Sequence, residues 1–267
     1  MSDNLSKTVG QSAPVWEQLR YEARTAVDQE PALASYIDAA ILSHPTFASA
    51  LAFHLAEKVS GKRLNSLQIR EICGQAYAAD SQIVLAAERD MQAVFNRDPA
   101  CRQLLQPFLF FKGFLALQVH RLAHWLWHEG RDTLALHFQS KTSELFPVDI
   151  HPATKIGCGI MFDHATGIVI GETAVIGDDC TIMQGVTLGG TGKDIGDRHP
   201  KIGNGVLVSV GAKILGNLTI GDQAKIAAGS VVLQDVLPLC TVAGVPAKPV
   251  GGPCAEAAKN MDQSIPE

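Results

Sequence analysis

Large aliphatic residues recur every six positions over about eighty residues in the second half of this 267-residue chain. The series runs in three frames: Ile150, Ile156, Phe162 and Ile168, then Ile170, Ile176, Ile182 and Leu188, then Ile202, Val208, Ile214, Ile220, Ile226 and Val232. An α-helix has 3.6 residues per turn and would scatter these positions around its surface. A period of six instead predicts a parallel β-helix, in which stacked coils satisfy one another's backbone hydrogen bonds.

The first half of the chain has a different period. From about residue 15 to 146 the apolar residues have helical spacing, interrupted by Pro31, Pro45, Gly61 and Pro99. We therefore predict an α+β protein: a helical domain over 1–146, with 1–14 flexible, a β-helix over 147–250 and a tail over 251–267. Fourteen positions separate Leu188 from Ile202, so the glycine-rich segment 189–201 is expected to leave the stack as one excursion loop.

Bulk composition excludes several classes of protein. Hydrophobic residues make up 46% and charged residues 18%, which is typical of a folded chain, and a net charge of −5 offers no basic field for nucleic acid. The six cysteines are scattered without a CxxC pair, and no signal peptide is evident, so a cytoplasmic protein is expected. The apolar run 104–127 contains Lys112 and Arg121, which disfavours a membrane span.

Several motifs together resemble one family. The stretches VDIHPATKIGCGIMFDHATGIVIGETAVIGDD, VTLGGTGKDIGDRHPKIGNGV, GAKILGN and VAGVPAKPVG follow a helical half, and this combination resembles bacterial serine acetyltransferase. The DRHPKIG block after GGTGK is the most diagnostic part, because many hexapeptide enzymes share the repeat alone. The resemblance covers about residues 15 to 250 and implies a left-handed β-helix, which is an exception to the usual right-handed crossover.

The resemblance implies acetyl transfer from acetyl-CoA to the hydroxyl of L-serine, the first step of cysteine biosynthesis. Such a transfer requires removal of the hydroxyl proton, which a positioned histidine does near neutral pH. His164 matches the family's base, and Asp149, fifteen residues earlier and on the neighbouring coil, matches the carboxylate that orients it. The structural alternative is that His164 fills a coil corner and Asp149 caps a turn.

Four further positions match residues that the family associates with the amino acid: Asp98, Asp163, Arg198 and His199. Arg198 can meet the serine carboxylate with a planar fork of donors, and the two aspartates can neutralise the ammonium. Asp98 lies far away in sequence, so the helical half would have to touch the β-helix. On sequence alone, Asp98 is also explained as a structural residue at the end of a helix, before Pro99.

The groove beside the coils is the expected place for acetyl-CoA. The candidate residues for the cofactor arm, its phosphates and the oxyanion are Gly190, Val210, Ala212, Lys225, Ala227 and Ala228. Small side chains would allow close approach of the arm, and backbone amides at Gly190 could stabilise the oxyanion. The chain departs from the family at Ser209 and Val210, where a Gly-Ala pair is usual, and the extra volume would narrow the groove or alter the pose of the cofactor.

Two local signals do not support other activities. His120, His124 and His128 share one helical face, but no HExxH glutamate lies between them and Trp125 and Trp127 indicate a packed helix, so we expect no metal there. The GGTGK segment lacks the GxxxxGK[ST] spacing of a phosphate loop.

Competing functions are an acetyltransferase for a sugar or xenobiotic, since fold does not fix substrate, and a zinc hydratase of the γ-carbonic-anhydrase type that would use His151, His164 and His199. A third class is a partner-binding scaffold. The family implies L-cysteine as a feedback inhibitor and a trimer, paired through the helical halves. Family members dock a terminal isoleucine into O-acetylserine sulfhydrylase; here Ile265 is not terminal, so we expect weak or no complex.

Overall fold

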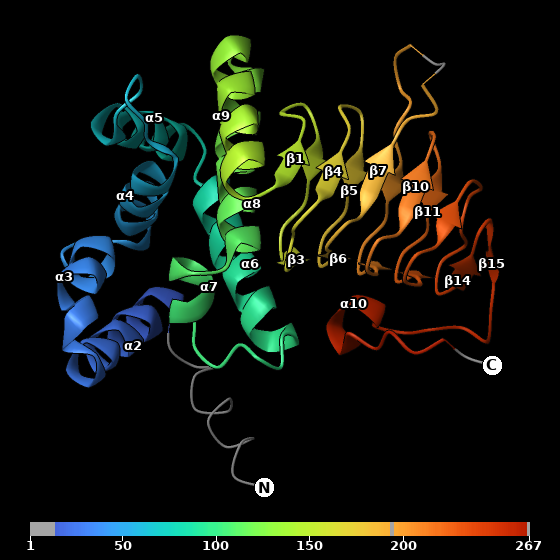
Figure 1. The fold of residues 1–267 in the computed structure, drawn as a ribbon, viewed down its shortest axis with the longest axis horizontal. Coiled ribbons are helices and arrows are strands. Elements are labelled where there is room, and N and C mark those ends of the chain that lie inside the picture. The colour runs from blue at the N-terminus through green and yellow to red at the C-terminus, as the bar shows by residue number, and fades with distance from the viewer. Residues whose placement is uncertain (1–13, 193–194, 266–267) are drawn as a thin grey trace, which may run out of the picture.

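The computed structural model describes residues 14–192 and 195–265, and it has a helical region at one end and a β-helix at the other (Figure 1). The expected flexibility of 1–14 falls, except for Pro14, outside the described residues. The α-helices are α2 (Val15–Gln29), α3 (Ala34–Ile37), α4 (Phe47–Val59), α5 (Ser66–Ala79), α6 (Gln82–Arg97), α7 (Leu105–Leu109), α8 (Lys112–His128), α9 (Asp132–Leu145) and α10 (Ala257–Asn260). Short 3₁₀ and π turns cover Pro31–Leu33 and Asp38–Leu42.

Local sequence signals explain several helix ends. Thr46 accepts a hydrogen bond from the backbone of Ser49 at the start of α4, and Asn65 does the same with Gln68 at the start of α5. In both places the third helical residue bonds back to the cap, which satisfies two backbone groups that have no partner within the helix. The helices predicted from the 3.6-residue period are present, although 33–43 forms the short α-helix α3 followed directly by a π-helical stretch over Asp38–Leu42 and not one regular helix.

The β-helix consists of three sheets whose parallel strands come from successive coils. The strands are β1 (Val148–Ile150), β2 (Lys155–Ile156), β3 (Met161–Asp163), β4 (Ile168–Ile170), β5 (Val175–Ile176), β6 (Thr181–Met183), β7 (Thr187–Gly189), β8 (Lys201–Ile202), β9 (Leu207–Val208), β10 (Lys213–Leu215), β11 (Thr219–Ile220), β12 (Lys225–Ile226), β13 (Val231–Val232), β14 (Thr241–Gly244) and β15 (Ala247–Pro249). Sheet orders are β1-β4-β7-β10-β13, β2-β5-β8-β11 and β3-β6-β9-β12-β14-β15, with β15 antiparallel. The predicted order of a helical region followed by a parallel β-helix is confirmed.

The interior of the coils is built from the period-six residues. Every member of the predicted series is buried except Ile156, which is only partly covered. The side chains of the helical region and the β-helix form one continuous core, so α6 and α8 lie directly on the first coils. The β-helix therefore packs directly against the helical region in the described chain.

Strand register shows where the repeat is interrupted. Val169 pairs with Thr187, an interval of 18 residues, whereas Val148 pairs with Ile168, an interval of 20. The two extra residues lie in the turn between β3 and β4, where His164 and Ala165 both have positive φ, of 53° and 60°. This insertion is the physical origin of the two-residue frame shift in the sequence.

A second interruption is the segment between β7 and β8. Val175 pairs with Lys201 at an interval of 26 residues, eight more than an ordinary coil, and the extra residues leave the stack as the predicted loop. Figure 1 shows this loop rising from the strands beside β7. Both interruptions fall at corners of the coil, where an insertion does not disturb the strands above and below.

No helix among the described residues is long and apolar enough to cross a membrane.

Candidate active site

The turn that follows β3 carries His164 at an edge of the β-helix. Turns of four coils stack here: the amides of Gly167, Gly185, Gly211 and Gly229 donate to carbonyls of the preceding coil at 2.7, 2.8, 2.9 and 2.8 Å. These glycines all have φ near 70°, a conformation that side chains disfavour. We call this edge, made of turns 164–167, 184–185, 210–211 and 228–229, the histidine edge.

His164 itself is exposed on this edge. Its side chain is 74% exposed, and its Nε2 lies 3.8 Å from Oδ1 of Asp163, whose side chain is only 15% exposed. The first turn of α8 supports the corner, because Lys112 hydrogen-bonds to Thr166 and Gly113 packs against the backbone of Phe162 so closely that a Cβ there would overlap it. The base candidate is thus held on a firm turn and open to a ligand.

Asp98 comes to the same edge from the helical region. It ends α6, and the preceding residue, buried Arg97, donates to the Cys180 carbonyl at 3.1 Å and to Asp179 at 3.3 Å. These bonds fix the end of α6 on the coils. Burial raises the pKa of Asp163, His164 lowers it, and the negative charge of Asp98 raises it further, so the two carboxylates lie close enough to repel each other. A cation between them would relieve that repulsion.

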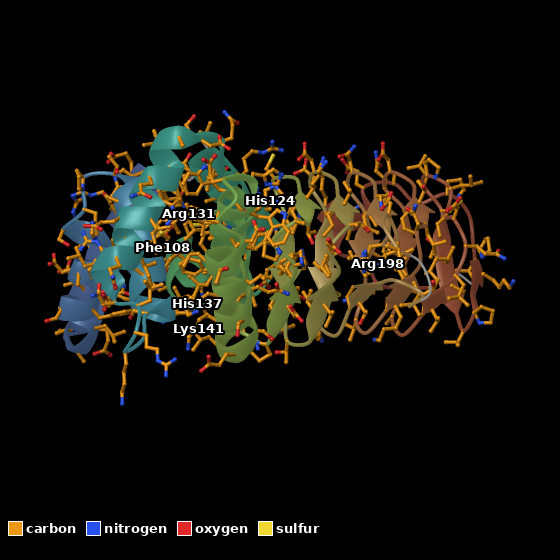
Figure 2. All side chains as sticks on the ribbon, turned by 90° about the horizontal axis from the view of Figure 1, so that it is seen from above. Phe108, His124, Arg131, His137, Lys141 and Arg198 are labelled. Atoms are coloured by element: carbon orange, nitrogen blue, oxygen red, sulfur yellow. The ribbon has the colours of Figure 1, made fainter. Side chains whose placement is uncertain are left out.

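Arg198 and His199 lie at a different edge, one strand away. This arginine edge is made of turns 151–154 and 171–173 together with residues 195–200, and Figure 2 shows Arg198 along the β-helix, away from the helical region. Gly171 follows Gly167 by four residue steps along the extended strand β4, so the two edges are about 13 Å apart. Within one chain the predicted substrate residues therefore form two groups and not a single pocket.

The arginine edge is organised by Glu172 and Thr173, which the sequence analysis did not single out. Arg198 Nη2 donates to Glu172 Oε2 at 2.6 Å. Thr173 Oγ1 accepts from the amides of Arg198 and His199 at 3.0 and 3.1 Å, so its own proton is available for Nδ1 of His199, 2.9 Å away. The sequence did contain a signal for this contact. Because the loop adds eight residues to an 18-residue coil, position 199 lies on the coil directly above position 173.

These contacts fix the proton on His199. Nδ1 accepts from the Thr173 amide at 3.2 Å, so the neutral ring carries its proton on Nε2. Burial lowers the pKa of His199 and the charge of Arg198 lowers it further, which keeps the ring neutral at neutral pH. The ring packs on Gly171, where a Cβ would overlap it. His199 is therefore a fixed hydrogen-bond donor beside a guanidinium.

Asp149 lies on the middle of β1, between the two edges. Its Oδ1 accepts a hydrogen bond from Gln139 Nε2 of α9 at 2.7 Å. Within the described part of the chain, Asp149 and His164 are joined by neither a hydrogen bond nor an ion pair. The pairing of these two residues stays a prediction.

The candidate cofactor residues differ in exposure: Ala228 is exposed and Val210 is partly buried. Val210 and Ala228 lie on the histidine edge, three or fewer coils from His164, whereas Ala212 and Ala227 are buried. Gly190 lies against the backbone and side chain of Arg198 on the other edge.

Lys225, the candidate for the cofactor phosphates, is covered by the C-terminal segment. Its side chain is 6% exposed, and its Nζ donates to the carbonyls of Asp262 and Ser264 at 3.1 and 2.7 Å. The segment would have to move before Lys225 could meet another anion.

Residues proposed for zinc do not converge. Among residues 14–192 and 195–265, no group of three or more histidine, cysteine, aspartate or glutamate side chains is arranged to hold a metal ion. His151 and His199 lie on the arginine edge and His164 on the histidine edge.

Comparison with known proteins identifies the same two halves. Residues 15–119 match the family model "Serine acetyltransferase, N-terminal", and residues 199–234 match the bacterial transferase hexapeptide repeat. Serine acetyltransferase of Escherichia coli K12 is 54% identical over 250 residues, covering 93% of this chain and 92% of that protein.

Solved structures agree over nearly the whole chain. The serine acetyltransferase of Neisseria gonorrhoeae in complex with serine is 49% identical, with a TM-score of 0.88, and 91% of this chain and 99% of that chain are covered. The enzyme of Brucella abortus in complex with coenzyme A is 45% identical, with a TM-score of 0.89, over 92% and 98% of the two chains.

Proposed function

The chain belongs to the serine acetyltransferase family of acyltransferases, and we propose that it transfers the acetyl group of acetyl-CoA to the hydroxyl of L-serine. The product would be O-acetyl-L-serine, and the reaction would be the first step of cysteine biosynthesis in the cytoplasm. Relatives solved with serine and with coenzyme A support this choice of substrates.

The observation that carries the proposal is the clustering of Asp98 and Asp163 beside an exposed His164. Two carboxylates in partial burial favour a bound cation, since it removes their mutual repulsion. An amino acid that binds with its ammonium between them would bring its side-chain hydroxyl to the adjacent imidazole. A sugar acceptor would not use this paired negative charge.

The proposed chemical step is a direct transfer. His164 takes the hydroxyl proton as the serine oxygen forms a bond to the thioester carbonyl carbon. When the carbon–sulfur bond breaks, the imidazolium returns that proton to the thiolate of coenzyme A. Asp149 would stabilise the imidazolium from the neighbouring coil, and its position would be maintained by Gln139.

The carboxylate of serine requires the arginine edge. Arg198 supplies a positively charged guanidinium with paired N–H donors, and His199 supplies a fixed Nε2–H donor. Both lie about 13 Å from the histidine edge of the same chain. We infer that a neighbouring protomer brings its arginine edge against this histidine edge. A trimer in which the three β-helices lie parallel would form three such sites, each completed by two chains.

Acetyl-CoA would lie along the histidine edge. Val210 and Ala228 are on the same stack of turns as His164, so an extended arm laid over them would point its thioester at the base. Lys225 would contribute to the phosphates only after the segment that carries Asp262 has moved. A serine acetyltransferase solved in complex with cysteine supports cysteine as an inhibitor of this site.

The test of the proposed reaction is release of free thiol from acetyl-CoA by the purified full chain. We expect release with L-serine, and little with homoserine, a simple sugar or no acceptor. Equal rates with the sugar, or release that does not depend on serine, would eliminate the assignment.

Sharing of the site between chains has a separate test. His164→Asn and Arg198→Ala variants should each be inactive, and mixing them after reversible dissociation should restore activity, because roughly a quarter of random interfaces then carry both native residues. A mixture that remains as inactive as its components would place the complete site within one chain.

A further inference from the structure

The side chain of Gln139 connects the helical region to the first strand of the β-helix. Gln139 lies on α9, and its Nε2 donates a hydrogen bond to Oδ1 of Asp149 at 2.7 Å. Asp149 is the carboxylate that would stabilise the imidazolium of His164. The bond to Gln139 occupies one carboxylate oxygen of Asp149, so the other oxygen, Oδ2, is available for a second donor.

The carboxylate of Asp149 has more than one possible partner. Asp149 is partly exposed beside a groove of about 460 Å³ between α9 and β1, so water reaches it. Burial lowers the pKa of His151, whereas the charges of Glu172 and Asp149 raise it, so Asp149 also lies near that ring. The torsion that rotates an aspartate carboxylate is broad. A carboxylate without a fixing contact would therefore turn among water, His151 and His164.

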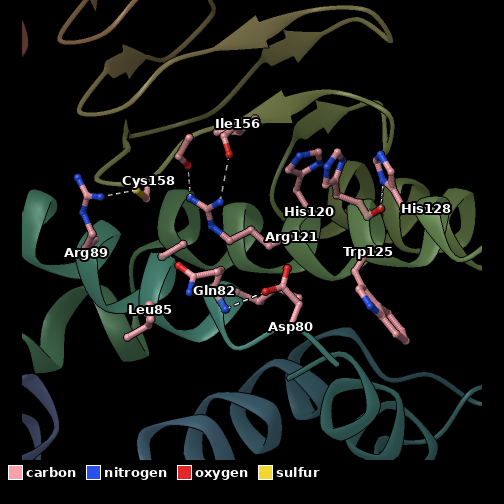
Figure 3. A pocket seen from close by; sticks show the side chains of 14 residues that line it. Asp80, Gln82, Leu85, Arg89, His120, Arg121, Trp125, His128, Ile156 and Cys158 are labelled. Carbon is pink, nitrogen blue, oxygen red and sulfur yellow. Dashed lines mark hydrogen bonds between the residues drawn. The ribbon is translucent and has the colours of Figure 1, made fainter. Parts of the chain in front are cut away.

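Gln139 is carried by a helix that is fixed against the coils. It directly follows Phe138, which is one of the buried residues of α9. The helix packs along α8, and α8 is bonded to the second strand of the first coil. Arg121 of α8 donates to the carbonyls of Ile156 and Gly157 at 3.4 and 2.7 Å, and Figure 3 shows its side chain reaching from α8 to this coil. The amide of Gln139 therefore has a stable origin.

The short connection from α9 to β1 also supports the turn of His164. Two residues, Phe146 and Pro147, separate the helix from the strand. The side chain of Phe146 is buried, and the carbonyl of Pro147 accepts a hydrogen bond from the amide of Gly167 at 2.7 Å. Gly167 closes the turn that begins at His164. The helix α9, the strand β1 and the turn that carries the base are therefore held together by adjacent residues.

An amide has suitable chemistry for this position. A carboxylate that stabilises an imidazolium must keep its negative charge, and a lysine or arginine in the place of Gln139 would neutralise it. The amide donates a hydrogen bond without bringing a charge. The neighbouring acid of α9, Glu144, accepts from Lys141 at 2.7 Å and so has a partner of its own.

We propose, on the basis of the proposed function, that Gln139 is a positioning residue for the general base. By holding Oδ1 of Asp149, it directs Oδ2 to the imidazole of His164, which orients the ring and stabilises its protonated form. A residue of the helical region thereby contributes to chemistry on the β-helix. Gln139 touches neither substrate, so its loss should lower kcat and leave the KM for serine and for acetyl-CoA unchanged.

The experiment is steady-state kinetics of the full chain with Gln139→Met and Gln139→Glu. Both variants keep the length of the side chain and remove the donor. Each should lower kcat about tenfold with both KM values unchanged, because the carboxylate loses its orientation. The melting temperature should stay near that of the native chain, since buried apolar residues hold α9 in place. The matched control Gln29→Met, at the exposed end of α2, should behave as the native chain.

A double-mutant cycle identifies the residue through which Gln139 acts. Asp149→Ala should lower kcat by itself. Adding Gln139→Met to Asp149→Ala should cause no further loss, because the amide then has no carboxylate to orient. A further loss of kcat in the double variant would mean that Gln139 acts through another group, and it would overturn the proposal.

Other results would overturn it as well. These are a native kcat in both Gln139 variants, a raised KM for serine at unchanged kcat, or a native kcat in Asp149→Ala, which would leave the oriented carboxylate without a role. Failure of the proposed function gives a different result: the native chain would release no thiol with serine, and this inference would be lost with it.

Discussion

Arg198 donates a 2.6 Å hydrogen bond to Glu172 across 26 residues of sequence, and this span contains most of the excursion loop. The guanidinium is thereby aimed before any ligand arrives. A ligand that binds to a loop usually loses affinity because the loop must become ordered. A charge-assisted hydrogen bond from Arg198 to the coil reduces that cost in free energy.

Glu172→Gln should therefore raise the KM for serine about tenfold, with a smaller change in kcat, since a charge-assisted bond becomes a neutral one. Steady-state kinetics with serine as the varied substrate measure the change. Glu129→Gln at the exposed end of α8 is the matched control and should behave as the native chain. An unchanged KM in Glu172→Gln would show that Thr173 alone positions Arg198.

His164→Asn should lower kcat by about 10²- to 10⁴-fold while the melting temperature changes little. Asparagine tolerates positive φ, so the turn with φ of 53° is retained while the base is removed. His137→Asn on α9 should leave kcat as it is. Turnover close to native in His164→Asn would remove this residue from the mechanism.

The raised pKa of Asp163 predicts a pH effect on serine binding. As pH falls through that pKa, the carboxylate takes up a proton and loses its attraction for the ammonium, so the KM for serine should rise at a higher pH than an ordinary aspartate would cause. Asp98→Asn removes one cause of the raised pKa and should move this rise to lower pH. A profile of kcat/KM against pH for both proteins tests the prediction.

The same shift affects stability with a defined sign. A carboxyl whose pKa is raised on folding contributes stability below its unfolded pKa and loses that contribution as pH rises. Asp163→Asn should therefore raise the melting temperature at neutral pH and have no such effect in acid, even though it weakens serine binding. A lower melting temperature at neutral pH would mean that Asp163 is stabilised by a partner.

Gly171→Ala should displace His199, because the added Cβ would occupy the position of the ring. We expect kcat/KM for serine to fall at least about tenfold. His199→Ala and the double variant should have the same activity, since the glycine acts only through the ring. Gly74→Ala, in α5 with open space around it, is the control. An additive loss in the double variant would contradict this explanation.

The period-six pattern was enough to predict the β-helix because each large aliphatic residue has one role, to fill a coil interior, and local spacing records it. The frame shift of two residues was visible as well, but its meaning became clear only from strand register, which identified His164 and Ala165 as the insertion. Sequence spacing of this kind predicts edges and corners reliably.

The contacts that organise the site could not be predicted in the same way. Glu172 and Thr173 are adjacent in sequence, yet their roles depend on Arg198 and His199 arriving from the far end of a loop. Asp98 reached the histidine edge as the family resemblance implied, and the reason is Arg97, whose bonds to Cys180 and Asp179 cross between the two halves. Such long-range polar contacts have no periodic signature.

The two-residue insertion at His164 and Ala165 has a consequence for how the family can change over time. The coils that follow have the 18-residue interval, except for the coil that contains the excursion loop. Loss of these two residues would therefore give their coil the same 18-residue interval. A single short deletion could then turn an enzyme into an inert but well-folded subunit. In this architecture the catalytic residues lie at the corners of the coils, and they can be lost while the β-helix that carries them is retained.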